Sequence, residues 1–136
     1  MTLKKLKKAN PLNREEEKFY FAPVQGSIIT LSEMAEQLSK TCSISSISIR
    51  SVLNAFFEEL PFLLKNGHPV RLDPFCSIRL SVSSNGKENA EDLTRDDIKD
   101  VHIIVTPSAR FKANLNSKEF IKSIKIIEEP NSETEN

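Results

Sequence analysis

The sequence predicts an α+β fold in which helices precede a small antiparallel sheet. Residues 45–64 place apolar side chains at the i, i+3, i+4, i+7 spacing of a helix with one buried face. After a stop at Gly67, apolar residues occupy every second position over residues 70–82, with a turn at 73–75. A third alternating stretch at 101–106 predicts another strand. Together these patterns predict a long helix followed by a three-stranded sheet with an arm.

The helix over 45–64 is more apolar than the few strands around it can cover. We therefore expect it to pack in a homodimer, where a second copy supplies the missing apolar surface. The residues predicted to form this dimer core are Ile49, Val52, Leu53, Phe56, Phe57, Leu60 and Phe75.

Local signals define the start and end of the predicted helices. Thr30 and Glu33 match a capping box, which predicts a short helix over residues 31–38. Ser45 is the predicted N-cap of the long helix. Pro61 lies inside that helix and removes one backbone hydrogen bond, so we expect a bend near its end.

The remaining segments give weaker patterns. Residues 1–14 are polar and without periodicity, which predicts an arm or an irregular lead-in, and residues 19–24 form a plausible strand. Residues 83–97 lack apolar periodicity and are expected to be an exposed loop or a mobile hairpin. A short helix is expected at 108–115, whereas residues 120–127 fit a helix and a strand equally well.

The composition narrows the functional classes. The chain has 136 residues, 38% of them hydrophobic and 28% charged, which is typical of one globular domain. No run of about 18 apolar residues is present, so we expect no membrane span. The basic start lacks the apolar segment of a signal peptide, so we do not expect export. Cys42 and Cys76 match no metal or redox spacing and are expected to be reduced, partly buried thiols.

Charge is balanced overall but uneven along the chain. The net charge is zero, unlike that of most proteins that coat DNA. Residues 87–100 carry three basic and six acidic side chains. Residues 110–125 carry five basic side chains and one acidic one. Residues 128–136 are acidic and poor in apolar residues, which predicts a disordered tail.

The order of these elements resembles the HU and integration-host-factor family of bacterial histone-like proteins. It is most similar to the HU-related branch with an additional N-terminal segment, and the resemblance covers roughly residues 19–120. The residues that carry it are Gly67, Val70, Leu72, Phe75, Ile78, Ile98, Ile103, Pro107, Lys112 and Leu115. Residues 44–53 resemble that branch's entry into its second helix, and residues 10–13 and 19–20 resemble its lead-in.

This resemblance implies an HU-like intertwined homodimer with two N-terminal helices, a β-arm and a short C-terminal helix. In the family, two arms embrace DNA through the minor groove and proline wedges kink the duplex. The resemblance divides the chain into a basic N-terminal extension (1–18), an HU-like DNA-binding domain (19–127) and an acidic tail (128–136). It also implies a location in the cytoplasm, at the nucleoid, with no cofactor, small-molecule substrate or membrane partner.

Three departures from the family pattern affect the arm and the last helix. The arm region contains no proline, so no wedge can be assigned. Pro74 and Cys76 replace the glycines that flank the family's turn phenylalanine. The family's Ala-Gly-Lys at the start of the last helix is Arg110-Phe111-Lys112 here.

Binding to duplex DNA would depend on basic side chains that neutralise phosphates. Arg71 and Arg79 alternate with core residues, so we expect them to face away from the helices. Lys112 matches a phosphate-contacting position of the family, whereas the arm's basic residues lie among acids and should bind weakly. The candidate DNA-binding residues are Arg71, Arg79, Lys87, Arg95, Arg110, Lys112 and Lys118.

A second hypothesis is a dimeric structural or protein-interaction module that kept the fold and lost tight DNA binding. The neutral net charge and the acidic arm favour it. An enzyme is not expected, because neither His68 nor His102 has an identifiable nucleophile or partner base. The acidic residues near 96–100 lack the order of a calcium loop, so no metal site is expected.

Overall fold

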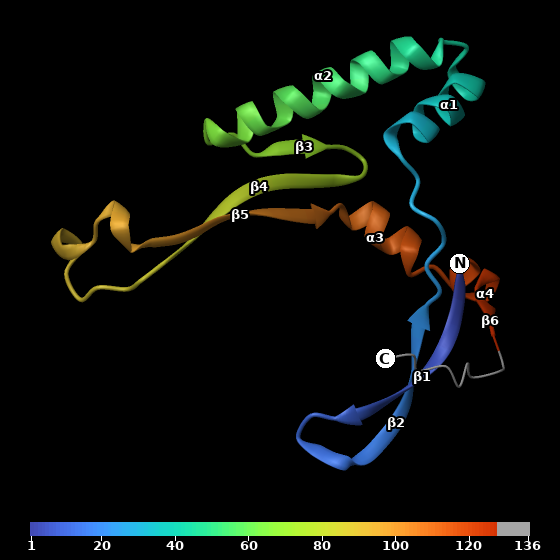
Figure 1. The fold of residues 1–136 in the computed structure, drawn as a ribbon, viewed down its shortest axis with the longest axis horizontal. Helices are drawn as coiled ribbons and strands as arrows, with labels where there is room; N and C mark the ends of the chain where they lie inside the picture. The colour runs from blue at the N-terminus through green and yellow to red at the C-terminus, as the bar shows by residue number, and fades with distance from the viewer. Residues whose placement is uncertain (128–136) are drawn as a thin grey trace. The chain divides into compact units, whose positions relative to one another are not determined.

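A computed structural model describes residues 1–127, and the predicted acidic tail over 128–136 lies outside the described residues. The chain divides into two compact units (Figure 1). The central unit is Ile29–Ala113, and the terminal unit combines Met1–Ile28 with the segment that begins at Asn114. The α+β class is confirmed, with helices and sheets in both sequence halves.

The first helix of the central unit, α1 (Leu31–Cys42), begins at the predicted capping box. The Thr30 hydroxyl accepts from the Glu33 backbone N–H at 3.3 Å, and the Thr30 backbone N–H donates to the Glu33 carboxylate at 3.0 Å. Two otherwise unpaired backbone donors are thereby satisfied. The helix ends at Ser43, which has a left-handed backbone conformation.

The long helix α2 (Ser46–Lys65) is also where the sequence predicts it. The Ser45 hydroxyl accepts from the Ser48 backbone N–H at 3.2 Å, as expected for an N-cap. The helix continues through Pro61 and stops before Gly67, whose φ of +87° is accessible to glycine without a Cβ penalty.

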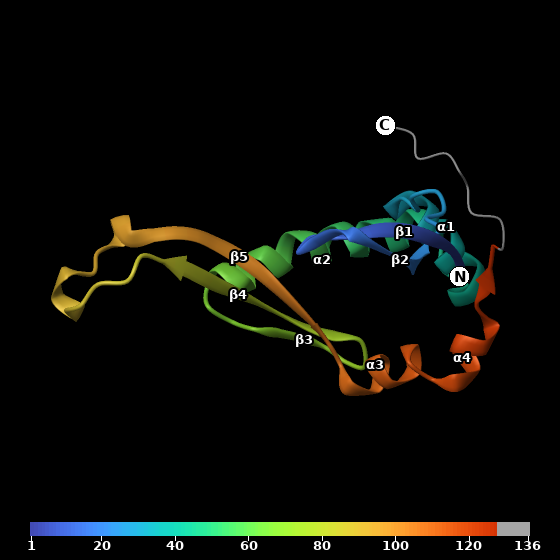
Figure 2. The same ribbon diagram turned by 90° about the horizontal axis from the view of Figure 1, so that it is seen from below.

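Three antiparallel strands complete the central unit in the order β3-β4-β5: β3 (Val70–Leu72), β4 (Cys76–Ser84) and β5 (Ile98–Pro107). The C-terminal end of helix α2 packs against this sheet (Figures 1 and 2). Their contact forms a core of three buried residues with four partly buried neighbours: Leu64, Cys76 and Ile78, with Leu60, Val70, Leu72 and Leu80. The predicted three-stranded antiparallel sheet is confirmed.

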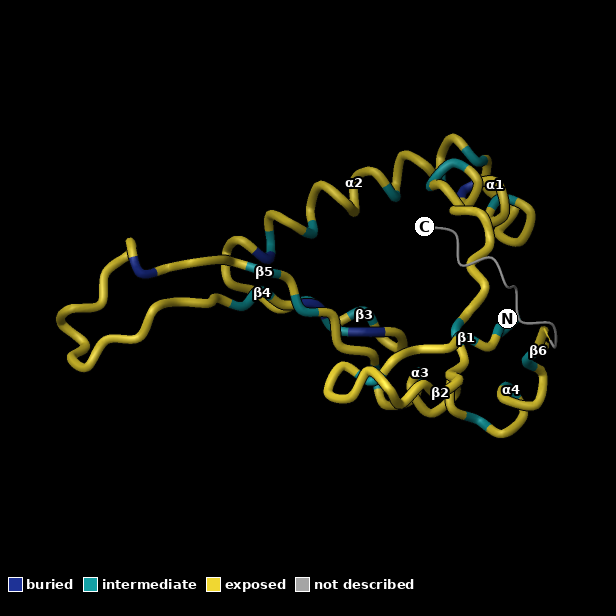
Figure 3. The backbone as a smooth tube through the Cα atoms, turned by 60° about the horizontal axis from the view of Figure 1, so that its bottom comes forward, coloured by how far each residue is buried: buried dark blue, intermediate teal, exposed yellow. Residues whose placement is uncertain are grey.

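The core of the single chain is small, and most of the described residues are exposed (Figure 3). Among the described residues, the buried apolar side chains are Ala35, Leu64, Cys76 and Ile78. The expectation that both thiols are partly buried is wrong, because Cys42 is exposed on α1 and Cys76 is buried in the sheet. Both cysteines are free.

The arm between β4 and β5 has more local structure than an exposed loop. Strand pairing reaches Ser84, and the Asn85 backbone N–H then donates to the Asp97 carbonyl at 2.8 Å. Two 3₁₀ turns follow, Ala90–Asp92 and Arg95–Asp97. The arm is thus a hairpin whose end is organised by short helical turns.

The Asp97 side chain contacts residues on both sides of this hairpin. Its carboxylate, in a residue only 8% exposed, accepts from the Thr94 backbone N–H at 3.0 Å and lies 3.6 Å from the Lys87 ammonium. A buried carboxylate is stable only when its lone pairs find such donors. One side chain therefore connects the two sides of the arm.

The segment after β5 combines both conformations that its sequence allows. The short helix α3 (Ala109–Leu115) confirms the prediction for 108–115. Residues 120–127 divide between the end of helix α4 (Lys118–Ser123) and the two-residue strand β6 (Lys125–Ile126). The Ile121 and Ile124 spacing belongs to the helix and its cap, whereas Ile126 belongs to the strand.

Of the two alternatives predicted for residues 1–14, an arm or an irregular lead-in, the irregular one is wrong. Strands β1 (Thr2–Asn10) and β2 (Asn13–Pro23) form an antiparallel hairpin, and β6 pairs with β1 in parallel. The strand expected at 19–24 is the second half of β2. The prediction failed because lysine and glutamate fill both faces of the hairpin, so no apolar alternation marks its strands. Strand β2 runs through the proposed boundary after residue 18, and the functional division there stays a prediction.

We expect Asp97→Ala to loosen the arm, because the Thr94 N–H and the Lys87 ammonium both lose a partner. A hydrogen bond to a charged group is worth about 1.5–3 kcal/mol. Hydrogen exchange at the Thr94 and Asp97 amides should become measurably faster. The matched control is Asp96→Ala, which removes the neighbouring exposed carboxylate, and equal exchange rates in the two variants would contradict the assigned role.

Candidate nucleic-acid interface

The second face of the β3-β4-β5 sheet, turned away from α2, is polar except for Ile104 and carries two arginines. Val70 pairs with Ile78 in the core, so the next pair along the ladder, Arg71 with Ser77, points to the opposite face. Arg79 follows two positions after Ser77 on that face. Both arginines are exposed, and neither forms an ion pair with any residue in the described part of the chain. We call this surface the arginine face.

Hydroxyl groups and an imidazole surround these arginines, and sequence reasoning did not select them. The ladder pairs Ser77 with Thr106 and Ser81 with His102 on the same face. Such side chains commonly donate hydrogen bonds to phosphate oxygens. The alternation that placed Arg71 and Arg79 was the signal that could have found them.

Near the arm, the arginine face carries an acidic residue, Asp100. The Asp100 carboxylate lies 3.4 Å from His102 Nδ1 and occupies the β5 position opposite Ser83. The surface available to an anion therefore lies between the β3–β4 turn and Ser81 rather than along the arm.

Ser108 attaches the start of α3 to the β3–β4 turn. Its backbone N–H donates to the Phe75 carbonyl at 2.8 Å, and its hydroxyl donates to the Pro74 carbonyl. The same hydroxyl accepts from the Phe111 backbone N–H at 3.1 Å, which caps the helix. The Phe75 and Phe111 rings pack edge to face with centroids 4.7 Å apart. These contacts fix α3 beside one end of the sheet.

Arg110 and Lys112 are thus carried by a helix that is anchored to the sheet. Arg110 is exposed and has no ion pair within residues 1–127. The Lys112 backbone N–H donates to the Ser108 carbonyl at 2.9 Å, in the first turn of α3. Lys118 is the first residue of α4 and belongs to the terminal unit. The structure therefore groups Arg110 and Lys112 with the sheet but does not group Lys118 with them.

The basic residues of the arm have acidic neighbours. Lys87 lies 3.6 Å from Asp97, and Arg95 shares its 3₁₀ turn with Asp96 and Asp97. These carboxylates offset the attraction of Lys87 and Arg95 for phosphate.

The residues selected as a dimer core are only partly covered by their own chain. Ile49, Leu53 and Leu60 are half-buried. Val52, Phe56 and Phe57 are 69%, 38% and 52% exposed. The Phe56 and Phe57 rings contact one another edge to face with centroids 5.5 Å apart. Phe75 is also exposed, apart from its contact with Phe111.

The uncovered apolar surface continues onto the sheet. Val101, Ile103 and Val105, on the α2 side of β5, are each 55% exposed. A hollow of about 380 Å³ opens between these strands and the end of α2, with Leu60, Leu80, Val101 and Ile103 among its walls. A single chain leaves this apolar surface in contact with water.

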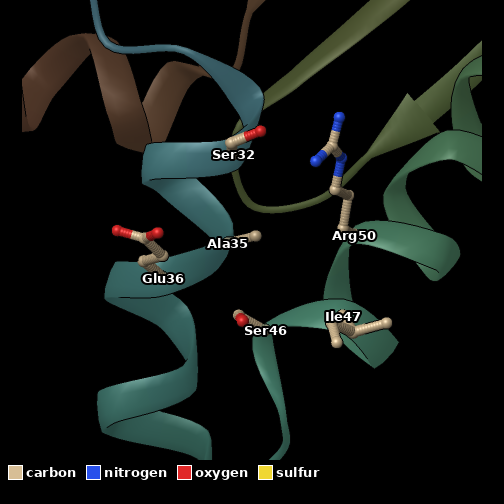
Figure 4. Close-up of a pocket in the computed structure, with 6 residues that line it drawn as sticks. All are labelled: Ser32, Ala35, Glu36, Ser46, Ile47 and Arg50. Carbon is tan, nitrogen blue, oxygen red and sulfur yellow. The ribbon is translucent and has the colours of Figure 1, made fainter.

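A second hollow lies between the two helices but offers little space for a ligand (Figure 4). Its volume is about 90 Å³, whereas small-molecule sites usually enclose about 300–1,000 Å³. The Arg50 guanidinium extends away from the Glu36 carboxylate in this view. Within the part of the chain that the structure describes, no three His, Cys, Asp or Glu side chains could together hold a metal ion. None of the helices there is long and apolar enough to cross a membrane.

Residues 2–122 match the family model HU-HIG, described as an HU domain fused to wHTH, Ig, or glycine-rich motif. This chain belongs to that family. The resemblance to HU proteins inferred from the residues is thereby confirmed, and no enzyme family is indicated. No curated protein matches the chain.

Two solved structures share the fold of this HU-family chain. The first is a putative bacterial DNA binding protein from Bacteroides vulgatus ATCC 8482, with a TM-score of 0.56 and 13% identity. The match covers 93% of this chain and 47% of that one, so the chain spans about half of the Bacteroides protein. The second is Anabaena HU in a cocrystal with DNA, with a TM-score of 0.51 and 14% identity, covering 65% of this chain and 98% of that one.

We expect Ser108→Ala to destabilise the central unit by about 1–2 kcal/mol, because it removes a helix cap and the bond to the Pro74 carbonyl. Thermal unfolding followed by circular dichroism measures the change. Ser83→Ala, at an exposed position on β4, is the control and should lie within about 0.5 kcal/mol of the parent chain. An equal effect of the two substitutions would show that Ser108 does not anchor α3.

Proposed function

We propose that this HU-family protein is a homodimeric architectural protein that binds duplex DNA without sequence specificity, through the backbone and the minor groove. The observation that carries the proposal is the two-sided sheet of the central unit. One side packs against α2, while the other presents Arg71 and Arg79 and has the basic start of α3 anchored at its end. In this proposal residues 19–127 form the DNA-binding domain, and the protein acts at the nucleoid in the cytoplasm.

The exposed apolar surface of a single chain supports the homodimer. Val52, Phe57 and Ile103 are each more than half exposed, although all three lie on elements of the central unit. An apolar surface of this extent is usually covered by another protein surface. A second copy is the occupant we propose, because symmetric pairing would bring the apolar side of each α2 against the same surface of its partner.

The charge distribution supports binding to the DNA backbone. Arginine presents a planar fork of donors that suits phosphate, and hydroxyl groups beside it add shorter-range donors. The fold neighbours agree with this proposal, since one is titled a putative DNA binding protein and the other is an HU–DNA cocrystal. Contacts of this kind read no sequence directly, which favours non-specific binding.

The acidic arm favours the second hypothesis, a dimeric protein-interaction module with an HU-like fold that has lost tight DNA binding. The pair between Lys87 and Asp97 uses a basic side chain within the arm, and the arm region offers no proline to insert between base pairs. DNA bending through the arms is therefore not part of our proposal. The sheet and α3 would supply the contacts instead.

We expect the chain to sediment as a dimer and Val52→Asp to shift it toward the monomer. The matched control is Asn54→Asp, which introduces the same side chain two residues away on α2, at an exposed position outside the apolar stripe. Both positions are exposed in a single chain, so a monomer would tolerate both changes equally. Analytical ultracentrifugation separates the outcomes, and a monomeric parent chain would contradict the homodimer.

We expect duplex binding to weaken strongly between about 50 and 200 mM salt, and the double variant Arg110→Ala/Lys112→Ala to weaken it further. Each lost phosphate contact should make the negative slope of log affinity against log salt shallower by about 0.9. Fluorescence anisotropy with two unrelated duplexes of equal length measures affinity and specificity together. Lys40→Ala/Lys65→Ala, at the ends of α1 and α2, removes the same charge away from the proposed surface.

Equal affinity for the two duplexes would support non-specific recognition. If the parent chain fails to bind at 50 mM salt, the interaction module becomes the better account. If Lys40→Ala/Lys65→Ala weakens binding as much as Arg110→Ala/Lys112→Ala, then α3 contributes to DNA affinity only through the net charge of the protein.

A further inference from the structure

The N-terminal hairpin sorts its lysines onto two chemically different faces. Between Leu3 and Ala9 on β1, and between Glu17 and Pro23 on β2, the register is regular, so alternate residues share a face. Lys4, Lys8 and Lys18 lie on one face, together with Leu6 and Tyr20. We call this the lysine face.

The opposite face has a lower net charge and is partly aromatic. Lys5 pairs with Phe21, and Lys7 pairs with Phe19. Lys7 also forms an ion pair with Glu17, which follows on the same face. Two lysines and one glutamate thus accompany two phenylalanines, and the ion pair neutralises part of the charge.

The lysine face has no such compensation within the regular ladder. Its members are all basic, apolar or aromatic, and the acidic Glu15 and Glu16 lie beyond the ladder, where the register shifts near the hairpin turn. Lys4, Lys8 and Lys18 form no ion pair with a residue among 1–127. At the other end of this face, β6 pairs Lys125 with Thr2 and brings a further basic residue.

Lys8 and Lys18 lie directly opposite each other across the two strands. Like charges at directly opposed positions destabilise a β-ladder. Three consecutive glutamates immediately precede Lys18 in the sequence, yet the register brings none of them opposite Lys8. An anion bound over this pair would remove the repulsion.

We propose that the lysine face is a second DNA-contacting surface, which binds the phosphodiester backbone of duplex DNA. The proposal rests on the proposed function for its ligand, but it uses residues outside the central unit. A run from Lys4 to Lys8 spans about 13 Å of strand, which is enough to follow several phosphates along one DNA strand. Tyr20 lies among the lysines and adds a hydroxyl that can donate to a phosphate oxygen.

The register supplies a matched pair of variants for the test. Lys4→Gln/Lys8→Gln and Lys5→Gln/Lys7→Gln remove the same charge from the same strand, but on opposite faces. The control also frees Glu17 from its ion pair, so any nonspecific loss of affinity should be larger in the control. Both variants are made in the full chain and titrated with the duplexes described above.

We expect Lys4→Gln/Lys8→Gln to make the negative slope of log affinity against log salt shallower by about 1.8 for each protomer bound. Its affinity for duplex DNA should fall roughly tenfold or more at about 100 mM salt. Lys5→Gln/Lys7→Gln should leave the slope near that of the parent chain. Because Lys8→Gln removes a like-charge pair, the midpoint of thermal unfolding should not fall, and this shows that a loss of binding is not a loss of folding.

The outcomes separate this inference from the proposed function. Equal slopes of log affinity against log salt in the two hairpin variants would overturn the inference. A loss of duplex affinity in Arg110→Ala/Lys112→Ala would still support the proposed function. A loss confined to Lys4→Gln/Lys8→Gln, with Arg71→Gln/Arg79→Gln and Arg110→Ala/Lys112→Ala binding like the parent chain, would establish the lysine face and refute the contact at the sheet. A parent chain that binds no duplex at 50 mM salt would overturn both.

Discussion

The contact between the end of α2 and the first half of β4 decides which side of the sheet is buried. Leu64 lies against Cys76 and Ile78, and this contact commits every second residue of β4 to the core. Because strand periodicity is two, a slip of one residue would exchange all the side chains between the two faces. Arg79 is exposed only because Ile78 is buried. The small core therefore controls the chemistry of a much larger surface.

The elements that sequence reasoning located are those with strong local signals. The hydroxyls of Thr30 and Ser45 and the glycine at 67 define helix ends within one turn, without help from distant residues. The hairpin at residues 2–23 has no such signal, although its two strands are adjacent in sequence. Charged side chains on both of its faces remove the apolar alternation that would mark the strands.

At the candidate interface, too, sequence reasoning located the residues with local signals and missed those that depend on distant contacts. The alternation of β3 and β4 identified Arg71 and Arg79, because a two-residue period is visible in a single strand. The anchor at Ser108 was not predictable, since its hydroxyl bonds to Pro74, 34 residues earlier in the chain. Sequence alone also placed Phe57 in a core, whereas a single chain leaves it half exposed. Apolar periodicity shows that a face is buried but not by which chain.

The parallel pairing of β1 with β6 has a consequence for the order in which the protein folds. Thr2 pairs with Lys125, so the terminal sheet closes a loop of roughly 120 residues. This loop can close only after the residues between the two strands have been synthesised. During synthesis the hairpin can form early, because its strands are adjacent, but its third strand emerges from the ribosome after the whole central unit. Completion of the terminal sheet would therefore follow synthesis of the helices and the β3-β4-β5 sheet, and the β1 edge that β6 covers would stay open until then.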